Sequence, residues 1–234
     1  MKYLGFIVAR AGSKGIPGKN LKKLCGKPLI QYTIEEALKS KFLDHVFLST
    51  DGEDILSFGK KFKGLDCDYS RPSELATDEA STVDTLIHGI GWLQAQKGLS
   101  FENIVLLQPT SPLRRVIDID EAICHYEKGN KNSLVSVNLV SENPMECVQT
   151  EKRGGWSYVA EPTANASRRQ DYDKKFYFIN GAIYIRNTKE FLKEKNLIIK
   201  NKSDLYEMPR ERGVDIDTDL DFAVAEHYMK LLSL

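Results

Sequence analysis

The sequence predicts an α/β fold in which a doubly wound, mostly parallel sheet carries helices on both faces. Apolar runs of strand length alternate along the 234 residues with longer amphipathic stretches, and this alternation is typical of right-handed crossovers between parallel strands. The runs are rich in β-branched residues, as strands buried on both faces tend to be. A glycine-rich, basic loop follows the first run, at the sheet edge where ligands of such folds bind.

Each element follows from these patterns in turn. The predicted strands cover residues 3–9, 45–50, 103–110 and 133–138, and the predicted helices between them cover 28–41, 53–62, 81–96 and 117–128. In the helix at 81–96 the apolar residues recur at helical spacing and predict one buried stripe, which consists of Val83, Leu86, Ile87, Ile90 and Leu93. Ser81 stands where the N-cap of that helix belongs.

The pattern changes at residue 140. The segment 140–180 mixes short alternating runs, a Gly-Gly turn and aromatic residues, which predicts a small antiparallel excursion from the main sheet. A further strand is expected over 179–187. A final amphipathic helix is expected over 217–234, with one side formed by Leu220, Ala223, Val224, His227 and Leu231. We expect one domain over 1–234, with the 140–180 segment inserted in it.

Composition excludes several classes of function. Lys and Arg together number 33, as do Asp and Glu, and this balance argues against a broad nucleic-acid footprint. No apolar run approaches the roughly 18 residues that a membrane span needs, and the N-terminus has no signal-peptide layout. The four cysteines are scattered without a Cys-x-x-Cys pair, which favours reduced thiols. We therefore expect a cytoplasmic protein with no nucleic-acid or membrane partner.

The loop VARAGSKGIPGKN, residues 8–20, fits neither common nucleotide-binding motif. Its glycines are spaced by three, whereas the Rossmann motif needs G-x-G-x-x-G, and Lys19 is followed by Asn20 where a P-loop has Ser or Thr. The physical basis of phosphate binding remains, because backbone N–H groups freed by glycines and nearby cations attract anions. A solvated basic turn is the alternative interpretation.

Seven segments along the chain carry a resemblance to a known family. In order they are ARAGSKGIPGKN, LSTDGEDI, RPSELATDEAS, LLQPTSPLR, RRQD, NGAIYI and DIDTDLDFAVAE. Together they resemble the acylneuraminate cytidylyltransferases, which couple CTP to a nonulosonic acid such as N-acetylneuraminate and make CMP-sialic acid. The resemblance implies a Rossmann-like nucleotidyltransferase fold. Related enzymes that activate the eight-carbon acid KDO differ in the first loop, which favours a nine-carbon substrate here.

The resemblance implies a reaction in which the anomeric hydroxyl of the acid attacks the α-phosphate of CTP and pyrophosphate leaves. Lys19 is the expected principal stabiliser of the transferring group, and the catalytic residues implied are Lys19, Arg168, Arg169 and Asp217. The nucleotide-binding residues implied are Arg10, Ser13, Lys14, Lys19, Asn20, Arg71, Ser81, Thr82 and Gln108. The sugar-binding residues implied are Gln108, Arg168, Arg169 and Asn180.

The acidic segment DIDTD predicts a metal site. In an extended segment Asp215 and Asp217 project to one side, where a cation would relieve their repulsion. Mg²⁺ suits this pair because it is commonly held by one or two carboxylates plus substrate phosphates; Mn²⁺ is the alternative. The resemblance implies that Asp217 is the chief ligand and Asp215 its support. An alternative role for Asp217 or Asp219 is to cap the final helix.

The resemblance also implies a homodimer, with 140–180 as its dimerisation subdomain. The aromatic residues there fit an apolar interface or packing onto their own sheet; they are Trp156, Tyr158, Phe176, Tyr177 and Phe178. Either Arg168 or Arg169 would grip the sugar carboxylate bidentately. The alternatives for function are the same reaction on a legionaminic, pseudaminic or KDO-type acid, or a non-catalytic nucleotide-sugar binder on the same scaffold.

Overall fold

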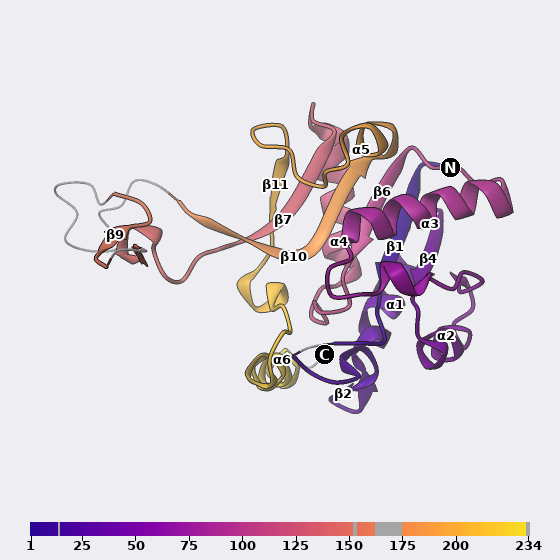
Figure 1. Cartoon of the computed structure of the whole chain (residues 1–234), viewed down its shortest axis with the longest axis horizontal. Coiled ribbons are helices and arrows are strands. Elements are labelled where there is room, and N and C mark those ends of the chain that lie inside the picture. The colour runs from indigo at the N-terminus through magenta and orange to yellow at the C-terminus, as the bar shows by residue number, and fades with distance from the viewer. Residues whose placement is uncertain (14, 152–153, 162–174, 233–234) are drawn as a thin grey trace.

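A seven-stranded sheet organises the protein (Figure 1). The computed structural model describes residues 1–13, 15–151, 154–161 and 175–232. The strand order is β11-β7-β10-β6-β1-β4-β5. Within it β10 is antiparallel to both neighbours, and the other strand pairs are parallel. The mostly parallel α/β sheet predicted from the sequence is confirmed.

The strands of this sheet are β1 (Tyr3–Val8), β4 (His45–Ser49), β5 (Leu65–Asp66), β6 (Asn103–Leu107), β7 (Ser133–Leu139), β10 (Tyr177–Asn187) and β11 (Asp204–Glu207). The helices are α1 (Leu29–Lys39), α2 (Glu53–Gly59), α3 (Thr82–Lys97), α4 (Val116–Lys128), α5 (Thr188–Glu194) and α6 (Asp219–Leu231). Two small antiparallel pairs join β2 (Lys23–Leu24) to β3 (Lys27–Pro28) and β8 (Val148–Thr150) to β9 (Trp156–Tyr158).

Helices cover both faces of the sheet. Successive side chains of each strand point to opposite faces, so each strand contributes to the core on either side. On β1, Ile7 belongs to a core shared with α1, α2 and α4, whereas Phe6 belongs to a second core shared with α3 and α5. On β6, Leu107 and Leu106 divide between the same two cores. This arrangement leaves the carboxyl ends of the parallel strands free to present loops.

Every predicted strand and helix is present, with ends displaced by a few residues. The sequence patterns missed β5, β11, α5 and the β2–β3 pair. These elements are short, and two or four residues of strand carry too little periodicity to be recognised. The buried stripe of α3 is confirmed in its centre, since Leu86, Ile90 and Leu93 are buried.

The final helix buries a different side from the one singled out in the sequence. Phe222, Ala225 and Met229 are buried in α6, whereas Leu220 and Leu231 are 73% and 67% exposed. Both sets of residues recur at helical spacing, so periodicity alone does not choose between them. The choice is made by packing, because Phe222, Ala225 and Met229 share a core with residues of the first loop and α1.

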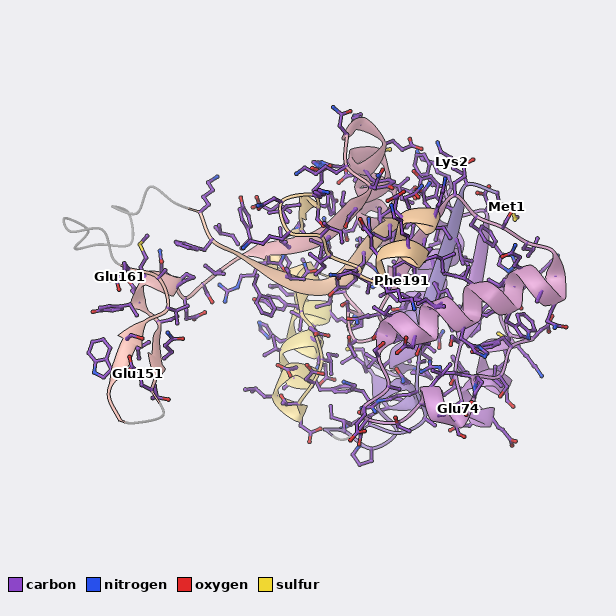
Figure 2. The ribbon with its side chains drawn as sticks, turned by 45° about the horizontal axis from the view of Figure 1, so that its top comes forward. Met1, Lys2, Glu74, Glu151, Glu161 and Phe191 are labelled. Carbon is purple, nitrogen blue, oxygen red and sulfur yellow. The ribbon has the colours of Figure 1, made fainter. Side chains whose placement is uncertain are left out.

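An arm leaves the body of the protein between β7 and β10 (Figure 1). It is the antiparallel excursion that the sequence predicts. It carries β8 and β9, and in the turned view Glu151 and Glu161 lie far from Met1 and Phe191 of the body (Figure 2). Several apolar side chains of this arm and its base are exposed, namely Leu139, Val148, Trp156, Tyr158, Val159, Phe178 and Ile179. The arm therefore exposes apolar side chains that the described residues do not cover.

Candidate active site

The basic loop after β1 folds back onto the acidic segment before α6. Lys19 begins a short 3-10 helix, Lys19–Leu21, directly after Gly18, whose φ of 61° is in the left-handed region that favours glycine. The Lys19 ammonium donates to the carbonyl of Ile216 at 2.7 Å and to Asp217 Oδ1 at 3.0 Å. The predicted phosphate-binding and metal-binding segments thus meet in one place.

Gly15 allows this approach. A Cβ at Gly15 would collide with the backbone carbonyl oxygen of Asp217, so only glycine fits there. Gly12 has no such reason inside the protein, because a Cβ there would meet no atom within 4 Å. Gly12 instead lines the cavity in front of the loop, where a bare backbone lets an anion come close to its N–H groups.

Hydrogen bonds to neighbouring segments hold the loop in shape. The buried Asn20 donates from Nδ2 to the carbonyl of Arg10 at 2.9 Å, which ties the two ends of the loop together. The N–H of Ala11 donates to Asp51 Oδ1 at 2.9 Å, and Arg10 pairs with Asp78 at 2.6 Å. Of the predicted loop residues, Arg10, Ser13, Lys19 and Asn20 are described, and Lys14 lies outside the described residues.

Asp215 is the buried member of the acidic pair. Its Oδ1 atom is buried and has no hydrogen-bond partner among the described residues. Burial raises the pKa of Asp215, and the charges of Asp217 and Asp221 add to the rise, whereas a Thr110 hydrogen bond and the Lys19 charge oppose it. A buried carboxylate oxygen without a partner is costly, and a cation would offset that cost.

Asp217 is the exposed member, with 74% of its side chain accessible. It does not cap the final helix, and neither does Asp219. The N-cap of α6 is Thr218, whose side chain accepts from the N–H of Asp221 while the Asp221 carboxylate accepts from the Thr218 N–H. Asp217 is thereby left free to project toward the loop and Lys19.

A cavity of about 320 Å³ lies between the loop and the acidic segment. It is lined by Val8, Arg10, Gly12, Ser13, Lys19, Asn20, Gln108, Pro109, Thr110, Asp215 and Asp217. This cavity, named the phosphate cavity after the ligand that the sequence predicts for the loop, gathers cationic side chains, an accessible glycine backbone and two carboxylates at the carboxyl ends of β1 and β6. Such a lining suits a polyanion that arrives with a divalent cation.

The donor set fits Mg²⁺ held together with substrate. In the part of the chain that the structure describes, no group of three or more His, Cys, Asp or Glu residues is arranged to hold a metal ion. Asp215 and Asp217 are therefore too few to form a protein-only cage. Mg²⁺ prefers this situation, because it usually keeps waters and takes only one or two carboxylates beside phosphate oxygens.

Gln108 lies at the same cavity, positioned by residues that the sequence analysis did not assign to the site. The completely buried Arg114 donates to the carbonyl of Gln108 at 3.1 Å and to that of Ala182 at 2.7 Å. Burial lowers the pKa of Arg114 to about 10. A methyl group at Gly181 would lie 2.8 Å from Gln108 Oε1 and 3.7 Å from Asp215 Oδ2. Arg114 stands in the segment LLQPTSPLR and Gly181 in NGAIYI, both of which carry the family resemblance. That resemblance was the signal that could have identified them.

A neighbouring cavity of about 290 Å³ contains two further predicted nucleotide contacts, Arg71 and Thr82. Its lining comprises Val8, Arg10, Arg71, Leu75, Thr77, Asp78, Ala80, Thr82 and Thr85. It shares Val8 and Arg10 with the phosphate cavity. The buried Arg71 is held by the Ser49 side chain and carbonyl. Ser81 lies outside this lining and caps α3, since its Oγ accepts from the N–H of Asp84 at 3.0 Å.

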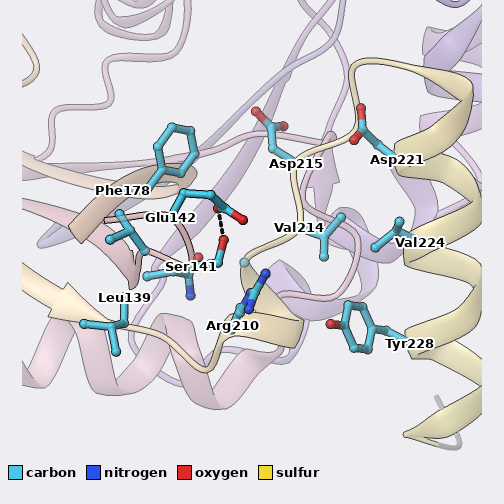
Figure 3. Close-up of a pocket in the computed structure, with 13 residues that line it drawn as sticks. Leu139, Ser141, Glu142, Phe178, Arg210, Val214, Asp215, Asp221, Val224 and Tyr228 are labelled. Carbon is cyan, nitrogen blue, oxygen red and sulfur yellow. Dashed lines mark hydrogen bonds between the residues drawn. The ribbon is translucent and has the colours of Figure 1, made fainter. Parts of the chain in front are cut away.

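Asp215 also lines a larger cavity of about 470 Å³, at the base of the arm. Figure 3 shows Asp215 and Asp221 at the top of this cavity and Arg210 and Tyr228 below them. Phe178 closes its upper left side in this view. The acidic segment therefore separates two cavities and belongs to both.

Three predicted site residues require separate mention. Arg168 and Arg169 lie outside the described residues. Asn180 is 1% exposed, and its amide is engaged by Ser136, Asn138 and the Ala182 N–H. It lines none of the three cavities. A residue that contacts a sugar would be expected to line a cavity, and Asn180 is instead buried among protein groups.

Comparison with known proteins finds similarity along almost the whole chain. Residues 4–226 match the family model described as cytidylyltransferase. The chain is 33% identical over 99% of its length to a CMP-N,N'-diacetyllegionaminic acid synthase from Legionella pneumophila, 97% of which is covered. It is 34% identical over 95% of its length to a pseudaminic acid cytidylyltransferase from Campylobacter jejuni, with 95% of that protein covered.

An N-acylneuraminate cytidylyltransferase from Streptococcus agalactiae is 34% identical over 95% of this chain, which spans only 52% of that longer protein. Among solved structures, a CMP:2-keto-3-deoxy-manno-octonic acid synthetase in complex with CTP has a TM-score of 0.67 at 17% identity. That similarity covers 99% of this chain and 100% of the other, and at this identity it concerns the fold alone. Within the described ranges, no helix is both long and apolar enough to span a membrane.

Proposed function

The chain belongs to the cytidylyltransferase family, and from this premise we propose how its active site works. The protein is a nucleotidyltransferase that couples CTP to the anomeric hydroxyl of a nonulosonic acid and releases pyrophosphate. One observation carries the proposed site: Lys19 and Asp217 lie 3.0 Å apart in a cavity that Asp215 and Gln108 also line. Attack at a phosphate requires the reactants to be aligned and the negative charge to be neutralised, and this cavity supplies both.

The basic loop holds the triphosphate. Lys19 places its ammonium at the α-phosphate and stabilises the charge that develops as the bond to pyrophosphate breaks. Arg10 and Lys14 add charge along the loop, and the backbone at Gly12 and Ser13 offers N–H donors. Asn20 keeps the loop closed through its bond to the Arg10 carbonyl. The leaving pyrophosphate is thus held by side chains and backbone of one short segment.

The cavity around Arg71 holds the cytidine. This placement of the cytidine is supported by the two residues, Val8 and Arg10, that line both this cavity and the phosphate cavity. Cytosine offers an acceptor at O2 and a donor at its amino group, which backbone and short polar side chains can read. Thr82 supplies such a group, and Ser81 fixes the start of the helix that carries it.

Asp215 and Asp217 would hold Mg²⁺ at the phosphates. The bound ion would polarise the α-phosphate and lower the pKa of the attacking hydroxyl. The buried Oδ1 of Asp215, which has no hydrogen-bond partner in the described part of the chain, supports this assignment. Gln108 orients the sugar beside the nucleotide, and Arg168 or Arg169 binds the sugar carboxylate bidentately.

A homodimer completes the proposal. The arm and its base expose Trp156 by 60%, Phe178 by 63% and Val159 by 56%, and exposed aromatic and aliphatic side chains of this kind favour an interface. A symmetric dimer would cover it with the same surface of a second copy. Replacing Trp156 by Ser should shift the protein toward monomer in sedimentation velocity, whereas an unchanged sedimentation coefficient would contradict the proposed interface.

The test of function is pyrophosphate release from CTP with a panel of acids. The panel contains N-acetylneuraminic, N,N'-diacetyllegionaminic and pseudaminic acids and KDO, each with Mg²⁺, with Mn²⁺ and with a chelator. We expect turnover with at least one nine-carbon acid and its loss with the chelator. Turnover with KDO alone, or full activity with the chelator, would contradict the proposed substrate class or the metal.

A further inference from the structure

Three buried polar side chains form a network between β7 and β10. Ser136, Asn138 and Asn180 are 0%, 6% and 1% exposed. The Ser136 hydroxyl donates to Asn180 Oδ1 at 2.6 Å and accepts from the Ile183 N–H at 2.8 Å. Asn180 Nδ2 donates to Asn138 Oδ1 at 2.8 Å. The two amides are therefore bonded to each other; Asn138 also lines the cavity at the base of the arm, whereas Asn180 lines none of the three cavities.

The network admits only one orientation of both amides. Asn138 Nδ2 donates to the carbonyls of Met208 at 2.7 Å and Pro209 at 3.1 Å. A carbonyl only accepts, so Asn138 must present its nitrogen there and its oxygen to Asn180. Asn180 must then present its nitrogen to Asn138, and its oxygen accepts from the Ala182 N–H at 3.1 Å. A buried network with every member satisfied makes the surrounding backbone rigid.

The backbone held on one side is the irregular part of β10. Ile179 pairs with Val137 and Tyr184 with Val135, so the register shifts between these pairs. Gly181 lies in this bulge with a φ of 74°, which favours glycine. Its Cα faces Gln108 Oε1 and Asp215 Oδ2 closely enough that an added Cβ would contact both. The bulge therefore forms a wall against two residues of the site.

The backbone held on the other side leads into the acidic segment. Met208 and Pro209 precede the short helix Arg210–Gly213, which is followed by Asp215 and Asp217. Gly213 packs so tightly on the Asn138 side chain that a Cβ at this position would collide with it. One amide pair thus connects the bulge and the approach to the proposed metal ligands.

We propose that Asn180 is a positioning residue, which acts through Asn138 to hold the β10 bulge and the acidic segment in register at the phosphate cavity. Asn180 itself makes no contact with substrate. This inference rests on the proposed function, because it assigns Asn180 a task in that reaction. Its role differs from the sugar contact that the sequence resemblance implies.

The experiment uses Asn180→Ala, Asn138→Ala and the double variant, with Asn103→Ala as the matched control. Asn103 is also a 6% exposed asparagine of the sheet, but it bonds to the Lys2 carbonyl and the Tyr126 hydroxyl at the start of β6. The first measurement is amide hydrogen exchange over residues 208–217, which needs no substrate. We expect the amides there to exchange faster than in the parent in both single variants. In the control variant the exchange rate there should match the parent, even where its melting temperature falls by the same amount.

The second measurement is steady-state kinetics with CTP and an acid that the parent turns over. We expect kcat to fall about ten-fold or more, because small displacements of reacting groups are costly, while KM for CTP stays within about two-fold. The Mg²⁺ concentration for half-maximal rate should rise. The double variant should lose little more than either single variant, since the two amides act as one unit.

Two results would overturn the inference. One is hydrogen exchange over 208–217 that matches the control. The other is a raised KM for the acid with kcat unchanged, which would make Asn180 a sugar contact. A parent without turnover on any acid would instead contradict the proposed function, and hydrogen exchange would still decide whether the amide pair holds the acidic segment.

Discussion

Lys19 Nζ lies 3.0 Å from Asp217 Oδ1 although 198 residues separate them in the chain. A second pair repeats the relationship beside it, with Lys22 Nζ 2.7 Å from Asp219 Oδ1. Only the first pair belongs to the phosphate cavity. The chain therefore offers its own control for each member of the proposed catalytic pair.

Replacement of Lys19 by Ala should lower kcat by roughly 10²–10³-fold, the range found when one stabilising group is removed from a transition state. Stopped assays of pyrophosphate release with saturating CTP measure this. Lys22→Ala is the control, because its partner Asp219 is exposed and such pairs contribute little. An equal loss in both variants would show that general loop charge, rather than Lys19, matters.

Replacement of Asp217 by Ala should abolish turnover and leave the fold intact, because 74% of the Asp217 side chain is accessible. Asp219, with 79% of its side chain accessible, is the matched control and should tolerate Ala. Circular dichroism checks the fold and pyrophosphate release checks the activity. A D217A protein that keeps an appreciable fraction of the parental rate would disprove the metal assignment.

Replacement of Gly15 by Ala should separate the loop from the acidic segment. Its new methyl group would collide with the Asp217 carbonyl, and overpacking of this kind costs about 1–3 kcal/mol of unfolding free energy. Activity should fall in parallel, because Lys19 and Asp217 move apart. The control is Gly91→Ala on the exposed side of α3, where no atom lies within 4 Å of an added Cβ. There Ala should stabilise by about 0.5–1 kcal/mol, as urea unfolding would show.

Replacement of Asp215 by Asn should increase the unfolding free energy at neutral pH in the presence of a chelator, while turnover is lost. Burial raises the pKa of Asp215 in the folded protein above its unfolded value, so the folded state binds the proton more tightly. Parental stability therefore falls as pH rises through the folded pKa, and the Asn variant escapes this loss. Its advantage should shrink as pH falls toward the unfolded value of about 3.9. Urea unfolding across this pH range measures the difference.

Asp66 provides the comparison of opposite sign. Burial acts to raise its pKa, but hydrogen bonds from His45 and Lys97 outweigh burial and lower the pKa of Asp66 to about 2. Its ionised form therefore stabilises the fold above the unfolded pKa, and this contribution is lost as pH falls toward 2. Asp66→Asn should destabilise at neutral pH. If Asp215→Asn also lowered the free energy of unfolding at neutral pH, burial would not be the dominant influence on the pKa of Asp215.

Much of the architecture was predictable because long elements carry strong periodicity. The apolar run of β1 predicts a buried strand, and the helical spacing of the α3 stripe predicts a helix. The site was predictable in part, since Lys19 and Asp217 stand in recognisable segments. Arg114 and Asn138 were not predicted as part of its support, because a buried polar side chain and a surface one look alike in a sequence.

The sequence alone determined the alternation of strands and helices, the loop chemistry and the acidic pair, because these depend on residue types at short spacing. Only the tertiary structure decided which side of α6 is buried, that Thr218 caps that helix, and that Asn180 turns inward. Each of those outcomes depends on contacts between segments far apart in the chain. Local spacing offers two or more equivalent choices there, and packing selects one.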